Sequence, residues 1–179
     1  MAGTGVLPFI RGIDLTHNDL QDDKFPEAME DMTSLRWLKL NNTKLRSIPE
    51  EVSKLQHLEH LTMKKNNVES ISSEIRNLPC LRTLNLRYNS LTHENIPAEV
   101  FENDELNTLD LSHNKLAEVP QGLFRCKSLL VLNLSHNLLE IIPSQLLMTT
   151  TDLLHLDLSN NELDALPPQL RRLSNLQTL

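Results

Sequence analysis

The chain has 179 residues, of which 3% are aromatic and 4 are glycine, and leucine is its commonest apolar residue. This bias indicates a core of branched aliphatic side chains and argues against a ligand pocket walled by aromatic rings. The formal net charge of −7 predicts a soluble chain and argues against general nucleic-acid binding, which needs a basic surface.

A pattern of the form L-x-x-L-x-L-x-x-N-x-L recurs seven times along the chain. The seven units begin at Ile10, Leu35, Leu58, Leu81, Leu106, Leu129 and Leu153. Their Asn-type positions are 23 to 25 residues apart, and self-similarity at such a period is typical of a solenoid. An eighth unit begins at Leu176, so we expect one domain, 1–179, that is truncated at its C-terminal end inside this unit.

Each unit predicts one short strand and one return segment. In the central L-x-L the two leucines point inward and the middle residue outward, which is the period of a strand, and such strands stack at about 4.8 Å. In four return segments a proline follows an aliphatic residue, as in Ile48-Pro49, and apolar residues spaced by three and four predict a one- to two-turn helix. The predicted fold class is α/β: a leucine-rich-repeat solenoid with a curved parallel sheet on its concave face and short helices or turns on its convex face.

Two departures from the repeat predict local differences. The Asn that follows each strand is expected to bond buried backbone groups of its own turn and of the next turn. In unit two Thr43 takes this place and supplies only a hydroxyl, so we expect a weaker or differently bonded turn there. Two-residue insertions before Phe25-Pro26 in unit one and Ile96-Pro97 in unit four predict a bulge at the convex edge.

The outward strand positions of units two to four gather cations around the single Trp and the single Tyr of the chain. Trp, Tyr and Arg are enriched in binding hot spots, and the concave sheet of a solenoid is its usual contact face. We therefore expect an acidic, helical segment of a protein partner to dock here. The alternative is that exposed strand positions are simply polar and that Trp37 fills a gap near the N-terminal edge. The candidate partner-binding residues are Trp37, Lys39, Thr62, Lys64, Lys65, Asn85, Arg87 and Tyr88.

The sequence argues against a metal site, a bound cofactor and enzyme activity. His17, His113 and His136 share one phase of the repeat, but a third ligand beside the last two is missing, so no metal site is expected. No glycine-rich phosphate loop or nucleophile elbow is present, so we expect neither a cofactor nor enzyme activity.

Location is predicted from the cysteines and the chain start. Cys80 and Cys126 lie at different phases of the repeat, which argues against a disulfide. The opening MAGTGVLPFI does not have the form of a secretory signal, and no apolar run reaches the roughly 20 residues of a membrane helix. We therefore expect an intracellular chain that contacts no membrane.

Several stretches resemble the N-terminal leucine-rich region of the flightless-I family, gelsolin-related proteins that remodel actin. They include GVLPFIRGIDL at 5–15, MTSLRWLKLNNTKL at 32–45 and TDLLHLDLSNNEL at 151–163. The match continues through LPPQLRRLSNLQTL at 166–179 and covers essentially the whole chain. The opening VLPFIRG, the RWLKL strand and Thr43 are more specific than LDLSHN, which repeats of many proteins share.

The resemblance implies a cytoskeletal and signalling adaptor that is cytoplasmic, cytoskeleton-associated or nuclear. It suggests two classes of protein partner, coiled-coil proteins that bind flightless and members of Ras-type GTPase pathways. Actin is bound in that family by downstream gelsolin-like domains, so actin binding is not carried over to these residues. The alternative identity is a leucine-rich-repeat scaffold of a Ras-type GTPase pathway that has no gelsolin part.

Overall fold

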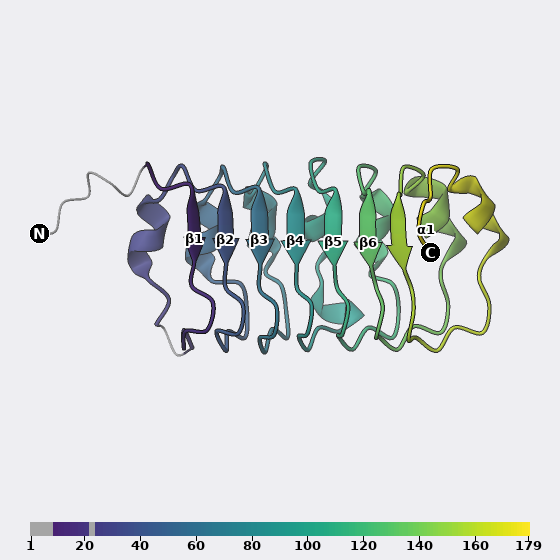
Figure 1. Cartoon of the computed structure of the whole chain (residues 1–179), viewed down its shortest axis with the longest axis horizontal. Helices are drawn as coiled ribbons and strands as arrows, with labels where there is room; N and C mark the ends of the chain where they lie inside the picture. Colours follow the sequence, from purple (N-terminus) through teal and green to yellow (C-terminus); the bar gives the residue numbers. More distant parts are fainter. Residues whose placement is uncertain (1–8, 22–23) are drawn as a thin grey trace, which may run out of the picture.

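The computed structural model describes residues 9–21 and 24–179, and these form an open stack of repeats (Figure 1). One parallel sheet has seven strands in chain order. The strands are β1 (Gly12–Asp14), β2 (Trp37–Lys39), β3 (His60–Thr62), β4 (Thr83–Asn85), β5 (Thr108–Asp110), β6 (Val131–Asn133) and β7 (His155–Asp157). The predicted α/β leucine-rich-repeat solenoid is confirmed. The opening residues 1–8, on which the prediction of no secretory signal partly rests, lie outside the described ranges, as do residues 22–23 in the segment before Phe25-Pro26 where the unit-one insertion was predicted.

The register places equivalent residues of successive units side by side. The central leucine of each strand pairs with the next, for example Leu38 with Leu61 and Leu61 with Leu84. These three side chains are fully buried. A one-residue slip would turn every inward leucine to solvent, so the repeat itself fixes the register.

The convex side is built mainly from short 3-10 helices, most of which lie behind the sheet in Figure 1. They are η2 (Glu27–Asp31), η3 (Glu50–Lys54), η4 (Ser73–Asn77), η6 (Ala98–Phe101), η7 (Gln121–Arg125) and η8 (Pro168–Arg172), and one α-helix, α1 (Ser144–Thr149), takes the same place in unit six. A 3-10 helix rises about 2.0 Å per residue, more than the 1.5 Å of an α-helix, so a short return segment spans its repeat with fewer residues. The unit-four insertion forms an additional 3-10 helix, η5 (His93–Asn95).

The Asn column joins the turns, but its side chains bond their own turn and that of the preceding unit, not that of the next unit as predicted. Asn137 donates to the carbonyls of Leu111 and Leu134, each at 3.0 Å, and accepts from the N–H of Leu116, also at 3.0 Å. Thr43 differs, because its hydroxyl donates to the carbonyl of Leu40 in its own turn at 2.9 Å. The Oδ1 of Asn66 lies 2.8 Å from the N–H of Thr43, so the next unit supplies the bond between the turns.

No helix among the described residues is both long and apolar enough to cross a membrane.

Candidate protein-binding surface

The face of the sheet turned away from the helices carries the predicted partner-binding residues. Trp37 and Lys39 lie in β2, Thr62 ends β3 and Asn85 ends β4. Lys64, Lys65, Arg87 and Tyr88 follow those last two strands, at the corner where the chain turns away from the sheet. We call this set of eight residues the basic patch, and its members lie on three neighbouring units whose strands are about 4.8 Å apart.

Trp37 forms the N-terminal end of the basic patch. A Cβ built on Gly12 would lie 1.8 Å from Cε2 of the indole, so the ring rests on the backbone of β1. Lys39 Nζ lies 5.3 Å from the ring centroid and 3.5 Å from Oδ2 of Asp14. Hydrogen bonds from Thr16, together with the charge of Lys39, hold the pKa of Asp14 below its usual value. Trp37 is still 40% exposed, so the ring both fills the space above Gly12 and remains open to a partner.

Three cations of the basic patch have no carboxylate partner within 4.0 Å in residues 9–21 and 24–179: Lys64, Lys65 and Arg87. Lys65 Nζ lies 5.8 Å from the ring centroid of Tyr88, and the guanidinium of Arg87 lies 4.9 Å from it. The patch therefore presents positive charge that the described residues do not neutralise, although the whole chain has a net charge of −7.

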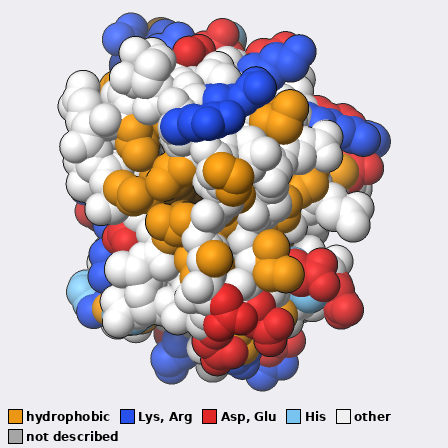
Figure 2. Space-filling model, turned by 90° about the vertical axis from the view of Figure 1, so that its right-hand side faces the viewer, with side chains coloured by type: hydrophobic (Ala, Val, Ile, Leu, Met, Phe, Trp, Pro, Cys, Tyr) orange, Lys and Arg blue, Asp and Glu red, His pale blue; other side chains and the backbone are white. Residues whose placement is uncertain are grey.

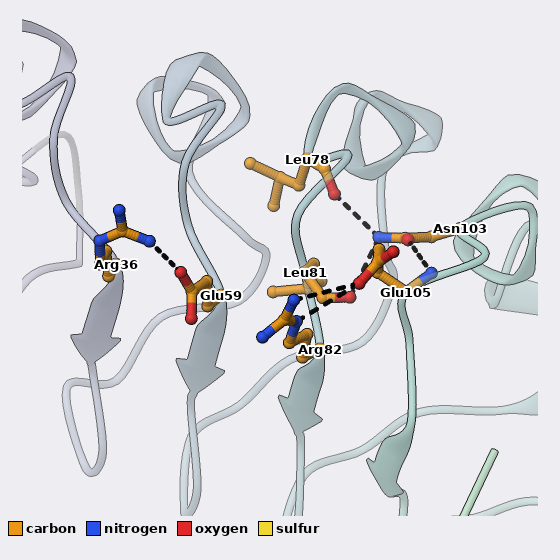
Figure 3. Close-up of polar contacts among 7 residues, drawn as sticks. All are labelled: Arg36, Glu59, Leu78, Leu81, Arg82, Asn103 and Glu105. Carbon is orange, nitrogen blue, oxygen red and sulfur yellow. Dashed lines mark hydrogen bonds and ion pairs between the residues drawn. The ribbon is translucent and has the colours of Figure 1, made fainter. Parts of the chain in front are cut away.

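At the opposite edge of the sheet, charged side chains form ion pairs between neighbouring repeats (Figure 3). Where the strands begin, Arg36 pairs with Glu59, and Arg82 Nη2 lies 3.4 Å from Oε2 of Glu105. Asn103 holds the second pair in place, because its Oδ1 accepts from the N–H of Glu105 at 2.9 Å. Charges on this edge are matched between neighbouring repeats, so the edge offers less unpaired charge to a partner than the basic patch does.

Asn85 and Thr62 contribute to local structure. Asn85 donates to Oδ2 of Asp110 at 3.0 Å and accepts from the N–H of Arg87 at 3.1 Å, which fixes the turn that carries Arg87. The hydroxyl of Thr62 is buried and has no hydrogen-bond partner among the residues described. The polar groups of these two residues are therefore less available to a partner than those of the exposed Lys64 and Lys65.

Arg87 and Tyr88 contact His113, which in turn stacks on His136, and neither histidine was among the predicted binding residues. The Tyr88 ring stacks on His113 with centroids 3.9 Å apart, and His113 stacks on His136 at the same distance. Arg87 Nη2 lies 3.2 Å from Nε2 of His113, while Arg87 Nε is buried without a partner in the described part of the chain. The shared repeat phase of the two histidines was visible in the sequence, but their stacking on Tyr88 depends on the conformation of the turn.

The histidine stack does not resemble a metal site. The ring planes of His113 and His136 are 13° apart and lie face to face, so the two imidazoles do not converge on one point between them. Within the described ranges, no group of three or more His, Cys, Asp or Glu side chains could hold a metal ion. Burial lowers the pKa of His113, and the charges of His136 and Arg87 act in the same direction while Asp110 opposes them.

Two hollows lie away from the basic patch. One, of about 700 Å³, is on the convex side and includes Leu45, Ile48 and Leu78 in its lining. The other, of about 460 Å³, lies at the C-terminal end of the stack, where Figure 2 shows hydrophobic side chains at the surface. Its lining includes Leu158 and Leu163, which equivalent units turn into the core, so its apolar character follows from its place at the end of the stack.

Comparison with known proteins agrees with this architecture. Family models described as leucine-rich repeat match residues 104–163 and 80–102, and one described as leucine-rich repeat region matches 5–89. Flightless-1 homologues of Danio rerio and Homo sapiens are each 63% identical to the chain over all 179 residues, and that of Caenorhabditis elegans is 49% identical over 98% of it. The chain spans 14% of the length of each of these relatives.

Solved structures show the same fold. A leucine-rich-repeat protein of Leptospira interrogans is 27% identical, with a TM-score of 0.80 over 97% of this chain and 49% of that one. A TDR receptor is 26% identical, with a TM-score of 0.77 over 96% of this chain and 34% of the receptor. The chain belongs to the leucine-rich-repeat family, and it is similar in sequence to the flightless-1 homologues.

Proposed function

We propose that the chain is a protein-interaction module whose concave face, at the basic patch, binds an acidic helical segment of a partner. One observation carries the proposal: Lys64, Lys65 and Arg87 lie on neighbouring units without a carboxylate partner among the described residues, beside two exposed aromatic rings. Arg and aromatic side chains that a partner can desolvate are the usual centres of binding energy.

The spacing of the repeats suits a helix laid along the stack. An α-helix advances about 5.4 Å per turn, and neighbouring strands lie about 4.8 Å apart. Acidic residues three or four positions apart on one helix face would therefore meet successive units of the basic patch. A partner helix in this orientation can place one carboxylate near Lys64 or Lys65 and the next near Arg87.

Electrostatics favours the same partner. Complementary charge raises the association rate and disfavours partners of the wrong sign. A positive patch on a chain of net charge −7 restricts this attraction to one face, because the rest of the surface repels acidic segments. Trp37 and Tyr88 would then supply apolar contact area at the two ends of the charged region.

We further propose that this module serves a flightless-type regulator of the actin cytoskeleton that also acts as a signalling adaptor. The identity with flightless-1 homologues supports this role, while the chain spans 14% of their length. Coiled-coil proteins are the partner class that best fits an acidic helix, and the proposed location is cytoplasmic and cytoskeleton-associated, or nuclear. Actin itself would be contacted by parts of such a protein other than these repeats.

The test is the affinity of a synthetic acidic helical peptide, with glutamates at i, i+4 and i+7, measured by fluorescence anisotropy. Lys64→Glu/Arg87→Glu should weaken binding about tenfold or more, because removing one partner of a charge pair that is buried in an interface costs about 2–5 kcal/mol. Lys115→Glu/Lys127→Glu is the matched control, since it changes the net charge equally at exposed positions outside the patch. Equal weakening in both variants, or in neither, would overturn the proposal.

A further inference from the structure

One column of residues runs along the corner where each strand ends, directly before the Asn position. All of its members have left-handed backbone conformations, with φ between 52° and 65°. The column consists of His17, Asn42, Lys65, Tyr88, His113, His136 and Asn160. Because the backbone turns in the same way in every unit, the side chains of this column stand above one another from repeat to repeat.

In units four to six this column is a continuous stack of rings, Tyr88, His113 and His136, which we call the ring ladder. Its ring faces cover each other, so the ring edges are left to face a partner. Lys65 lies over the outer side of Tyr88, and Asn160 Nδ2 lies 3.1 Å from Nε2 of His136 at the other end. The ladder thus continues the basic patch from unit four into units five and six.

The contact of Arg87 with His113 requires a neutral imidazole at His113. Arg87 can only donate, so Nε2 of His113, 3.2 Å from Arg87 Nη2, must accept and carry no proton. The groups that face His113 are Arg87 and Tyr88 from unit four, Asp110 from its own unit and His136 from unit six. Among these, Asp110 alone favours a charged imidazole.

We propose that the ring ladder is part of the partner-binding surface and that a proton on His113 controls whether Arg87 is available to an acidic partner. This inference rests on the proposed function of the basic patch. With His113 neutral, Arg87 is held against the ladder, and its Nε is enclosed without an acceptor. A proton on Nε2 removes the acceptor and places two positive groups side by side, so Arg87 turns outward to where a carboxylate can bind it.

Acidic partners should therefore bind more tightly as the pH falls below neutral. Two changes act together: the released guanidinium gains accessible donors, and protonated His113 adds a positive charge to the surface. By linkage, a bound acidic segment must favour the protonated form of His113 by the same factor. The substitution that tests this is His113→Asn, since the column already holds Asn42 and Asn160 in the same left-handed conformation.

The first experiment uses the protein alone and follows the imidazole resonances and the Arg87 Nε–H resonance by NMR between pH 5 and 8. His113 should titrate below an ordinary histidine, and the Arg87 resonance should move with the same midpoint. His136→Asn should raise the His113 midpoint, while His57→Asn, an exposed histidine outside the ladder, should leave it unchanged. An Arg87 resonance that stays constant through the His113 titration would overturn the inference without touching the proposed function.

The second experiment measures the affinity of the acidic helical peptide at pH 7.5 and pH 5.5. Binding to the wild-type chain and to His57→Asn should strengthen by about fivefold or more at the lower pH, and binding to His113→Asn should change little. Binding of equal strength at both pH values would overturn the ladder's role and leave the basic patch as a binding site. No binding at either pH would overturn the proposed function. In that case the NMR titration of the Arg87 resonance would alone test whether a proton on His113 releases Arg87.

Discussion

The indole of Trp37 rests on the backbone of Gly12. The other strands of the sheet carry a side chain at the position that Gly12 occupies in β1. Gly12 pairs with Trp37 in the register of β1 and β2, so the two residues are direct neighbours. Any side chain at position 12 would occupy the place of the ring. The position of the Trp37 ring over β1, and hence its use at a binding surface, depends on this glycine.

Gly12→Ala is expected to displace the Trp37 ring toward solvent. The added Cβ would lie 1.8 Å from the ring, so the side chain must change its rotamer. The chain has one tryptophan, so its fluorescence reports this site alone, and the emission should shift to longer wavelength. Affinity for the acidic helical peptide should fall as well, and an unchanged emission maximum would show that the ring does not depend on Gly12.

Asn137→Ala is expected to lower the free energy of unfolding by about 3 kcal/mol, since it leaves several backbone groups without partners. The side chain is buried and bonds the turns of units five and six. Urea unfolding measures the effect. Asn67→Ala removes an exposed amide next to the column and should change stability by less than about 0.5 kcal/mol; similar losses in the two variants would contradict the structural role of the column.

The two cysteines should differ in reactivity. Burial, with a smaller effect of Asp104, raises the pKa of the Cys126 thiol to about 12, whereas Cys80 is half-buried. Since the thiolate is the reactive form, Ellman's reagent at pH 8 should modify Cys80 well before Cys126. Cys80→Ser should remove the fast phase, and both thiols should react at once in denaturant. A fast phase that survives in Cys80→Ser would show that Cys126 is accessible.

Stability should fall on the acid side of neutral because of His113. The folded chain holds this imidazole below its usual pKa, chiefly through burial, so the unfolded chain binds the proton more readily. The contribution is complete above the unfolded pKa, about 6.5, and is lost as the pH falls toward the folded value. Urea unfolding at pH 7.5 and 5.5 measures the free energy of unfolding at each pH. This free energy should change less between the two pH values for His113→Asn than for the wild-type chain. An equal difference would mean that His113 titrates alike in both states.

The repeat pattern predicted the strands, the register and the inward leucines, because burial of a period-two face fixes all three. It also predicted the altered turn at Thr43, since a hydroxyl offers fewer hydrogen bonds than an amide. The sequence predicted short helices on the convex side, but it did not distinguish the 3-10 form from the α form. That choice depends on the length each return segment must span, which the spacing of apolar residues leaves open.

The basic patch was predictable as a set of outward positions, while its internal contacts were not. The sequence places Asp110 and His113 in the unit next to Arg87, and pairing with the carboxylate would have been the simpler expectation. Asp110 is instead bonded by Asn85 and by the N–H of Ser112, which leaves His113 to accept from Arg87. The left-handed turn that stacks Tyr88 on His113 leaves no mark in the leucine pattern.

The most direct measurement of the binding surface is an NMR titration of the labelled chain with the acidic helical peptide at pH 6.5. Resonances of the Trp37 indole, of Lys64, Lys65 and Arg87, and of the Tyr88 and His113 rings should shift and saturate together. Residues of the convex helices η3 and η4 should stay unchanged. Shifts confined to those helices, with the sheet face unaffected, would contradict a binding site on the basic patch.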